Sequence, residues 1–220
     1  MANPEDVQRL KISNKDMRTL PDEIVEMKNL RELILFRDHI DTIPAIIGKL
    51  TQLTKLSVSS CRLQRIDDAL GRLCNLQVLH LQNNSLTEIP FTIGELSSLK
   101  ECWLYNNYID SLPTSIGKLD KLQILFANGN SLKTLPASFG NLSSLRFLYL
   151  GRNDLISLPR EMGNLKSLVE LDLTNAGAVL QIPESICAIH NLETLYIDPT
   201  IVIPYCLESR ISSHFKIVVK

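Results

Sequence analysis

Apolar and polar positions alternate over short stretches of this chain, and the same arrangement returns every 23 residues. In the stretch 99–122, apolar residues stand at Leu99, Cys102 and Leu104, and a Leu-Pro pair ends at Pro113. Equivalent units open at Leu30, Leu53, Leu76, Leu99, Leu122, Leu145, Leu168 and Leu192, where only the last step has one extra residue. Self-similarity at this period indicates a repeat architecture in which neighbouring units stack.

Each unit predicts one strand, one turn and one short helical return. Alternating leucines over the first six positions indicate a strand with one buried face. The proline after the next apolar residue suits the first helical position, because its missing N–H has no helical partner there. A glycine follows near the end of that helix in six units, as Gly94 and Gly117 do, where a left-handed residue is often needed.

An asparagine follows the strand in the middle units. Its amide can donate to and accept from backbone groups that the turn would otherwise bury unpaired. The residues at this position are Asn84, Asn107, Asn130 and Asn153, whereas Lys15, Asp38, Cys61, Ala176 and Thr200 replace asparagine in the other units. The predicted asparagine ladder is therefore complete only in the middle of the chain. We also expect a local bulge beside Ala176, where the extra residue lies.

The units LPTSIGKLDKLQILFANGNSL and LPREMGNLKSLVELDL resemble the leucine-rich repeat family, over about residues 7–202. Their LPxxIGxLxxL return is similar to the 23-residue Ras-suppressor-type and bacterial class. The resemblance implies an α/β fold, a curved horseshoe solenoid with a parallel β-sheet on its concave side and short helical or 3-10 returns on its convex side. It also implies a non-enzymatic module that binds other proteins. We expect one domain over residues 1–220, closed by a C-terminal cap of one helix and one strand at about 203–220.

Aromatic side chains gather at the strand positions predicted to face solvent. Stability does not require this, although aromatic residues also favour strands for their own sake. An exposed apolar patch rimmed by charge marks a binding site, and Trp and Tyr are frequent anchors of interfaces. The predicted partner-binding residues are Phe36, His80, Trp103, Tyr105, Tyr108, Phe126, Phe147, Tyr149 and Tyr196. We expect a protein or peptide partner at these residues.

Charge changes along the same predicted face. The first three units place Arg9, Lys11, Arg31, Arg37, Lys55 and Arg62 against Glu32, and the last three place Asp154, Glu170, Asp172, Glu193 and Asp198 against Arg146 and Arg152. Such a gradient can orient a partner by complementarity, although ordinary surface charge accounts for it equally well. The formal net charge of −1 gives no general attraction to nucleic acid or to a membrane surface, and neither partner is expected.

The chain shows no sign of catalytic chemistry. Its four histidines, His39, His80, His190 and His214, lie in different units without metal-ligand spacing, and no phosphate loop or nucleophile motif occurs. We therefore predict no enzyme activity, no metal and no cofactor. Two alternatives remain: a carbohydrate or other ligand receptor, because aromatic rings beside asparagines and acids can stack on sugars, and the recognition domain of a larger signalling enzyme.

Compartment and assembly are predicted from simple features. The start MANPEDVQRL has neither the basic nor the apolar region of a signal peptide. Five scattered cysteines without a CxxC pair fit reduced thiols better than a disulfide framework. We accordingly expect a cytoplasmic monomer in a signalling or scaffold role.

Overall fold

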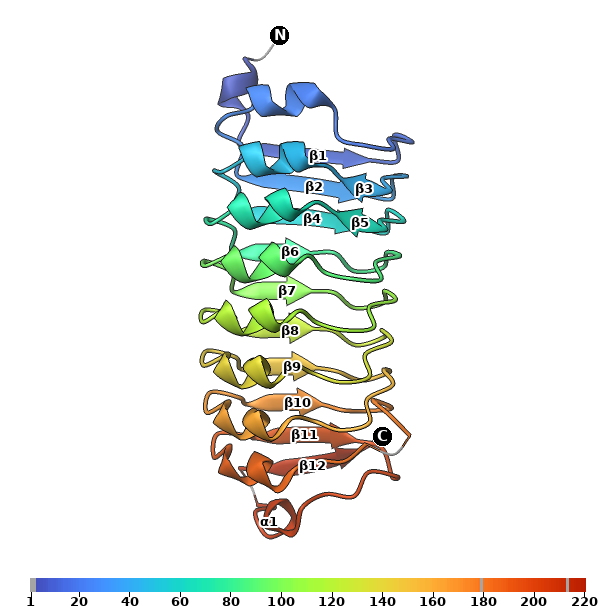
Figure 1. Cartoon of the computed structure of the whole chain (residues 1–220), viewed down its shortest axis with the longest axis vertical. Coiled ribbons are helices and arrows are strands. Elements are labelled where there is room, and N and C mark those ends of the chain that lie inside the picture. The colour runs from blue at the N-terminus through green and yellow to red at the C-terminus, as the bar shows by residue number, and fades with distance from the viewer. Residues whose placement is uncertain (1–2, 179, 213) are drawn as a thin grey trace.

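The computed structural model describes residues 3–178, 180–212 and 214–220, and a single ten-stranded parallel sheet runs through them. One strand from each unit joins this sheet, and the last unit adds a second, so the units stack along one axis, as Figure 1 shows. The strands, in sheet order, are β1 (Arg9–Ser13), β2 (Glu32–Phe36), β4 (Lys55–Ser59), β6 (Val78–His80), β7 (Glu101–Trp103), β8 (Ile124–Phe126), β9 (Phe147–Tyr149), β10 (Glu170–Asp172), β11 (Thr194–Ile197) and β12 (Lys216–Val219). The predicted repeat fold is thereby confirmed.

Strand pairing follows the repeat period. Glu101 of β7 lies opposite Ile124 of β8, exactly one unit further along the chain. Glu170 of β10 lies opposite Thr194 of β11, so the extra residue of that unit is accommodated outside the strands. The bulge predicted there includes residue 179, which lies outside the described residues. A second sheet, of two short strands, pairs β3 (Thr42–Ile43) with β5 (Arg65–Ile66).

The helical returns are 3-10 helices that lie across the core from the sheet (Figure 1). A proline sits at the N-cap of most of them, one residue before the predicted position, with an extended backbone such as φ −65° and ψ 147° at Pro113. In the described residues they are η1 (Pro4–Asp6), η2 (Asp22–Glu26), η3 (Ala45–Lys49), η4 (Asp68–Arg72), η5 (Phe91–Glu95), η6 (Thr114–Lys118), η7 (Ala137–Asn141), η8 (Arg160–Asn164) and η9 (Glu184–Ala188).

The left-handed conformation expected at the helix glycines is wrong. Among the described glycines only Gly129 has a positive φ, and it lies in a turn rather than in a helix. A Cβ on Gly117 would lie 2.2 Å from the carbonyl oxygen of Ser138 in the next unit. Glycine is required there because the returns of neighbouring units pack with their backbones almost in contact.

The asparagine ladder is confirmed. The Asn107 side chain accepts a hydrogen bond from the Leu86 N–H at 3.1 Å and donates to the carbonyls of Leu81 and Leu104 at 3.0 and 2.8 Å. It therefore joins its own strand end to the unit before it. Asn84, Asn130 and Asn153 make the same set of contacts.

The last unit is closed by α1 (Tyr205–Glu208) and β12, the helix and strand expected there. Leu207 and Phe215 are buried against the core. The expectation that all five cysteines are reduced is wrong: Cys187, in η9, and Cys206, in α1, form a disulfide with a Cα–Cα distance of 6.0 Å. Sequence spacing did not reveal this pair, because only the fold of the last unit brings the two residues together.

A candidate binding surface on the sheet

Four rings from adjacent strands form a continuous row on the solvent side of the sheet. His80, Trp103, Phe126 and Tyr149 occupy the same register position in β6, β7, β8 and β9. The His80 and Trp103 rings stack with centroids 3.9 Å apart, Trp103 meets Phe126 edge-on at 5.5 Å, and Phe126 stacks on Tyr149 at 4.3 Å. We call these four residues the aromatic row. The period of the repeat produces it directly, because parallel strands place equivalent residues side by side.

A glutamate holds each end of the aromatic row. His80 Nε2 lies 3.1 Å from Glu101 Oε1, and the Tyr149 hydroxyl donates to Glu170 Oε1 at 2.8 Å. Burial lowers the pKa of His80 and outweighs the opposing effect of Glu101. Burial also raises the pKa of Tyr149, and the hydrogen bond to Glu170 raises it further. Both end rings are consequently neutral near pH 7 and held in one orientation.

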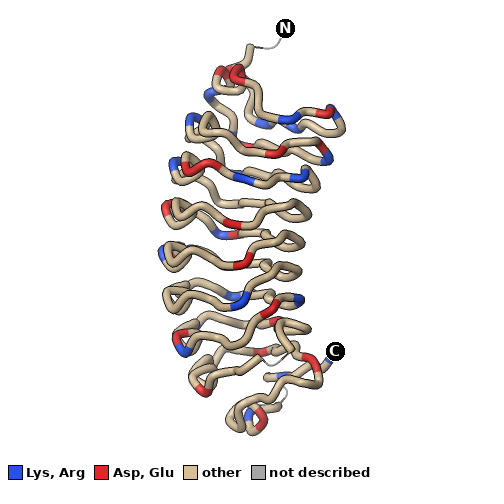
Figure 2. The backbone as a smooth tube through the Cα atoms, turned by 45° about the vertical axis from the view of Figure 1, so that its right-hand side comes forward, with Lys and Arg blue, Asp and Glu red and all other residues tan. Residues whose placement is uncertain are grey.

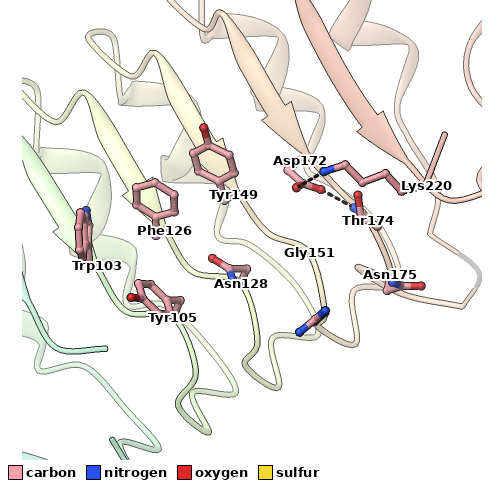
Figure 3. Close-up of a pocket in the computed structure, with 11 residues that line it drawn as sticks. Trp103, Tyr105, Phe126, Asn128, Tyr149, Gly151, Asp172, Thr174, Asn175 and Lys220 are labelled. Carbon is pink, nitrogen blue, oxygen red and sulfur yellow. Dashed lines mark hydrogen bonds and ion pairs between the residues drawn. The ribbon is translucent and has the colours of Figure 1, made fainter. Parts of the chain in front are cut away.

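A hollow of about 590 Å³ opens beside the aromatic row. Gly151 contributes to its floor, because the position that carries Asn128 in the unit before it and Thr174 in the unit after it has no side chain here. The hollow is lined by Trp103, Tyr105, Phe126, Asn128, Tyr149, Gly151, Arg152, Asp172, Thr174, Asn175 and Lys220 (Figure 3). One side of it is therefore aromatic and the other polar and charged.

Two polar atoms near the hollow have unused hydrogen-bonding capacity. Trp103 Nε1 and Thr174 Oγ1 are buried and, within the described part of the chain, have no hydrogen-bond partner. Both residues line the hollow. Buried polar atoms are normally paired, so these two are exceptions in the layer directly beneath the hollow.

The structure brings together only part of the predicted set. Trp103, Tyr105, Phe126 and Tyr149 line the hollow. His80 is only 8% exposed and supports the Trp103 ring rather than facing the hollow.

The remaining predicted residues lie outside the lining of the hollow. The ring of Phe36 lies under the guanidinium of Arg37, and that of Phe147 under Arg146. Tyr108 is 63% exposed and lies in the turn that follows β7. Tyr196, in β11, lies under the Lys220 ammonium.

Sequence reasoning missed the polar side of the hollow. Asn128, Gly151 and Thr174 share one position of the repeat, which is the strand-end position that also holds Tyr105. Only the aromatic members of that position were predicted to bind, although its sequence already shows the change from aromatic to polar residues. No repeat signal predicts Lys220, because it follows β12, which departs from the repeat pattern.

The described residues give no indication of metal or membrane chemistry. They contain no group of three or more His, Cys, Asp or Glu side chains arranged to hold a metal ion. None of their helices has the length and apolar character needed to cross a bilayer.

Comparison with solved structures finds similar folds in bacteria and plants. The Leptospira interrogans LRR protein LIC12759 has a TM-score of 0.86 and 32% identity, and the match covers 97% of this chain but 55% of that one. The LRR ectodomain of the Arabidopsis thaliana receptor kinase GASSHO1/SCHENGEN3, solved in complex with CASPARIAN STRIP INTEGRITY FACTOR 2, has a TM-score of 0.73 and 29% identity, covering 92% and 28%. This chain thus spans about half of the first protein and less than a third of the second.

A third similar structure is the leucine-rich repeat domain of the type III effector XCV3220 (XopL). Its TM-score is 0.78 at 27% identity, and the match covers 88% of this chain and 69% of that one. No curated protein matches the sequence. A family model described as "Leucine-rich repeat region" matches residues 64–148 and 137–212, which together make up more than half of the chain. The chain belongs to the leucine-rich repeat family, whose fold is a protein-interaction module.

Proposed function

We propose that this protein binds a protein or peptide partner on the concave, solvent side of its sheet, without catalysing a reaction. The observation that carries the proposal is the aromatic row, four rings in contact over four adjacent strands, beside the hollow at Gly151. Large, rigid rings bury much surface at little entropic cost, and they are the usual anchors of interfaces. We expect Phe126 to be the central anchor, because it contacts Trp103, Tyr105 and Tyr149.

Two solved relatives support a peptide as the partner. The GASSHO1/SCHENGEN3 ectodomain is in complex with CASPARIAN STRIP INTEGRITY FACTOR 2, and the plant peptide hormone receptor RGFR1 is in complex with RGF2. The RGFR1 match covers 81% of this chain at 27% identity and 34% of that chain, with a TM-score of 0.67. A row of side chains across parallel strands suits an extended peptide that crosses the strands.

Compartment and oligomeric state belong to the same proposal. We expect a monomer that presents this surface to its partner. The cytoplasmic location remains a prediction, and the Cys187–Cys206 disulfide favours a more oxidising compartment. Alkylation of the protein in fresh cell extract, with and without reductant, measures whether this pair is oxidised in its natural setting.

A carbohydrate is the second candidate ligand. The hollow places the polar side chains of Asn128 and Thr174 opposite the Phe126 and Tyr149 rings, an arrangement that can both stack on a sugar and bind its hydroxyls. The two candidates differ in what a binding screen recovers. A glycan array and a displayed library of random 12-residue peptides, applied to the same protein sample, separate them.

The test of the proposed surface is the double substitution Trp103→Ala with Phe126→Ala. Both rings are half-buried, so we expect a modest fall in the thermal midpoint and a loss of peptide binding of at least tenfold. Phe91→Ala is the matched control, because that ring is 58% exposed on η5, away from the sheet. If the double variant binds selected peptides as the wild type does, the site lies elsewhere. Binding of glycans, but not of peptides, by the wild type would favour the second candidate.

A further inference from the structure

The ammonium group of Lys220 lies at the edge of the hollow, in a site formed by two other strands. Its Nζ is 3.4 Å from Asp172 Oδ2 on β10 and 3.8 Å from the centroid of the Tyr196 ring on β11. Lys220 follows β12, and its backbone N–H donates to the Ile197 carbonyl at 2.9 Å. The side chain therefore crosses β11 to reach Asp172, as Figure 3 shows. We call Asp172 and Tyr196 the lysine site.

The lysine site has the chemistry of a cation receptor. A carboxylate beside an aromatic face attracts a cation through both charge and the ring quadrupole. The Asp172 carboxylate is oriented beforehand, because its Oδ1 accepts a hydrogen bond from the Thr174 N–H at 2.8 Å. The Asp172 side chain is only 19% exposed, which makes an attraction there stronger than on an open surface.

Lys220 is a replaceable occupant of this site. Its side chain is 46% exposed, and the contact with Asp172 is long for a charge-assisted hydrogen bond. Ordering this long, partly exposed side chain offsets part of the attraction to Asp172. The fold of the site rests instead on backbone pairing of β10, β11 and β12, which does not need the Lys220 ammonium.

Charge on the sheet face favours a basic partner at this end. Glu170 and Asp172 of β10 are partly exposed on this face, whereas Asp198, which follows β11, is buried. Figure 2 shows acidic and basic positions along the chain. At the opposite end the same face carries Arg9 and Lys11 of β1, although Arg9 is paired with Glu32 at 3.1 Å.

We infer that the lysine site binds a Lys or Arg side chain of the partner peptide, and that Lys220 competes with it for Asp172 and Tyr196. The inference rests on the proposed function and adds the class of side chain that the peptide must carry. Lys220 acts as an intramolecular competitor, which lowers the affinity for every peptide whose basic residue must displace it. The partner's cation then takes the place that the Lys220 ammonium holds in the structure.

The repeat geometry predicts where that basic residue lies in the peptide. Tyr149 on β9 and Tyr196 on β11 are two strands apart, or about 10 Å at the usual strand spacing. A peptide in the extended polyproline II conformation advances about 3.1 Å per residue and turns the same face to the sheet every three residues. A peptide that crosses the strands therefore places its basic residue about three positions from the apolar residue that covers Tyr149.

The experiment is a peptide selection with matched variants. Random 12-residue displayed peptides are selected on the wild type and on Lys220→Met, Asp172→Asn and Asp120→Asn. Lys220→Met removes the ammonium and keeps the length of the side chain, whereas Asp172→Asn keeps the acceptor for Thr174 and removes the charge. Asp120→Asn changes an exposed acid in the turn after η6 and is the charge-matched control.

We expect peptides selected on Lys220→Met to be enriched in Lys or Arg at the predicted spacing, and those selected on Asp172→Asn to lack this enrichment. For one resynthesised peptide, Lys220→Met should tighten Kd about threefold to tenfold, and Asp172→Asn should weaken it about tenfold. Lys220→Met made in the Asp172→Asn background should change Kd much less than it does in the wild type, because the carboxylate for which the two cations compete is gone.

Three results would overturn the inference. They are equal enrichment of basic residues on both variants, an unchanged Kd in Lys220→Met, and equal tightening for peptides that carry no basic residue, which would make Lys220 a steric obstacle only. In each case peptides would still bind and remain sensitive to Trp103→Ala with Phe126→Ala, so the proposed function would stand. Failure of every variant to select peptides would overturn both.

Discussion

The middle units and the last unit of this solenoid are joined to their neighbours in different ways. Between β6 and β9, each unit places one asparagine under its turn, and that side chain bonds to backbone groups of the unit before it. The last unit has threonine at this position and is joined through the Cys187–Cys206 disulfide and the added strand β12. A unit with two neighbours can form hydrogen bonds with both, whereas an end unit has only one neighbour and needs an additional covalent link or strand pairing.

The second unit differs from the middle units by a single atom at the same position. Asp38 replaces asparagine, and its Oδ1 accepts from the Lys15 N–H at 2.7 Å, as Asn84 Oδ1 accepts from the Cys61 N–H at 2.9 Å. Asp38 Oδ2, however, takes the place of the amide nitrogen and has no hydrogen-bond partner within the described residues. The carboxylate thus accepts the backbone N–H as an asparagine does, but it cannot donate to the backbone carbonyls that an asparagine amide would bind.

The comparison predicts that stability is local in this chain. Solenoids behave as rows of units coupled to their nearest neighbours, so a change in one unit acts mainly on that unit and the next. The stability of the middle units should depend on their buried asparagine amides, and that of the last unit on its disulfide. Near the start of the chain, the unpaired oxygen of Asp38 should lower stability in a way that one substitution can reverse.

The largest expected effect follows loss of the disulfide. Cys187→Ala with Cys206→Ala opens a link between residues 19 apart in sequence, which should cost about 3 kcal/mol at that end of the chain. Because the link is local, α1 and β12 should lose amide protection before the middle strands do. Hydrogen exchange, resolved by segment, measures this order.

Cys74→Ala is the control for that experiment, since Cys74 is exposed and free. Reductant alone should reproduce the double substitution and leave the control unaffected. An equal loss of amide protection in all strands from β1 to β12 would contradict the idea that the disulfide stabilises the last unit independently of the others.

Asn107→Ala should have the next largest effect. It leaves the Leu86 N–H and the carbonyls of Leu81 and Leu104 without their buried partner, at a cost of about 1–3 kcal/mol in the free energy of unfolding. Lys15→Ala, the same position in the first unit, should change little, because Lys15 is exposed and has no amide. Urea denaturation of both variants compares them directly, and equal costs would show that the amide is not what stabilises the turn.

Asp38→Asn should stabilise the protein by about 1–2 kcal/mol, the reverse of the usual effect of a buried substitution. The repeat places the carbonyls of Ile12 and Leu35 where the Asn84 amide finds those of Val58 and Leu81, so the new amide has acceptors. Asp41→Asn, an exposed acid in the same unit, is the matched control and should be neutral. A destabilised Asp38→Asn would mean that the turn of the second unit differs from the middle turns in more than one atom.

How far the sequence predicts the structure depends on whether a feature repeats. Leu99, Asn107 and Pro113 recur at fixed offsets, so the parallel sheet, the amide ladder and the helical returns follow from the sequence alone. The reason for glycine at position 117 does not follow from the sequence, because the close approach of Ser138 is a contact between units. Periodicity predicts the contents of one unit better than the spacing between two.

The candidate site shows the same division. The column of Trp103, Phe126 and Tyr149 was predictable, since equal offsets in parallel strands lie side by side. Burial of His80 behind Trp103 was not, because position alone does not tell a supporting ring from an exposed one. Lys220 approaches Asp172 from 48 residues away, and no pattern in the sequence links them.

The smallest expected effect is a pH dependence at the boundary between the first and middle units. His80 lies opposite Ser57 of β4, and burial lowers its pKa, with the charge of Lys55 acting in the same direction. The unfolded chain takes up this proton near the ordinary histidine value of about 6.5, whereas the folded chain resists it. The unfolded state then binds more protons, so this contribution to stability is complete above that pH and is lost as the pH falls below it.

Unfolding free energies measured between pH 7.5 and pH 5 test this sign. His80→Gln should flatten the fall in stability on acidification, even though loss of the ring stacked on Trp103 lowers stability at every pH. The slope of unfolding free energy against pH therefore measures proton uptake by His80, and the difference that remains at every pH measures the loss of ring packing. His190→Gln is the control, because His190 is exposed, and it should leave the slope unchanged. A slope that is the same in wild type and His80→Gln would mean that the hydrogen bond to Glu101 compensates the protonated ring fully, and that the first ring of the aromatic row can carry charge.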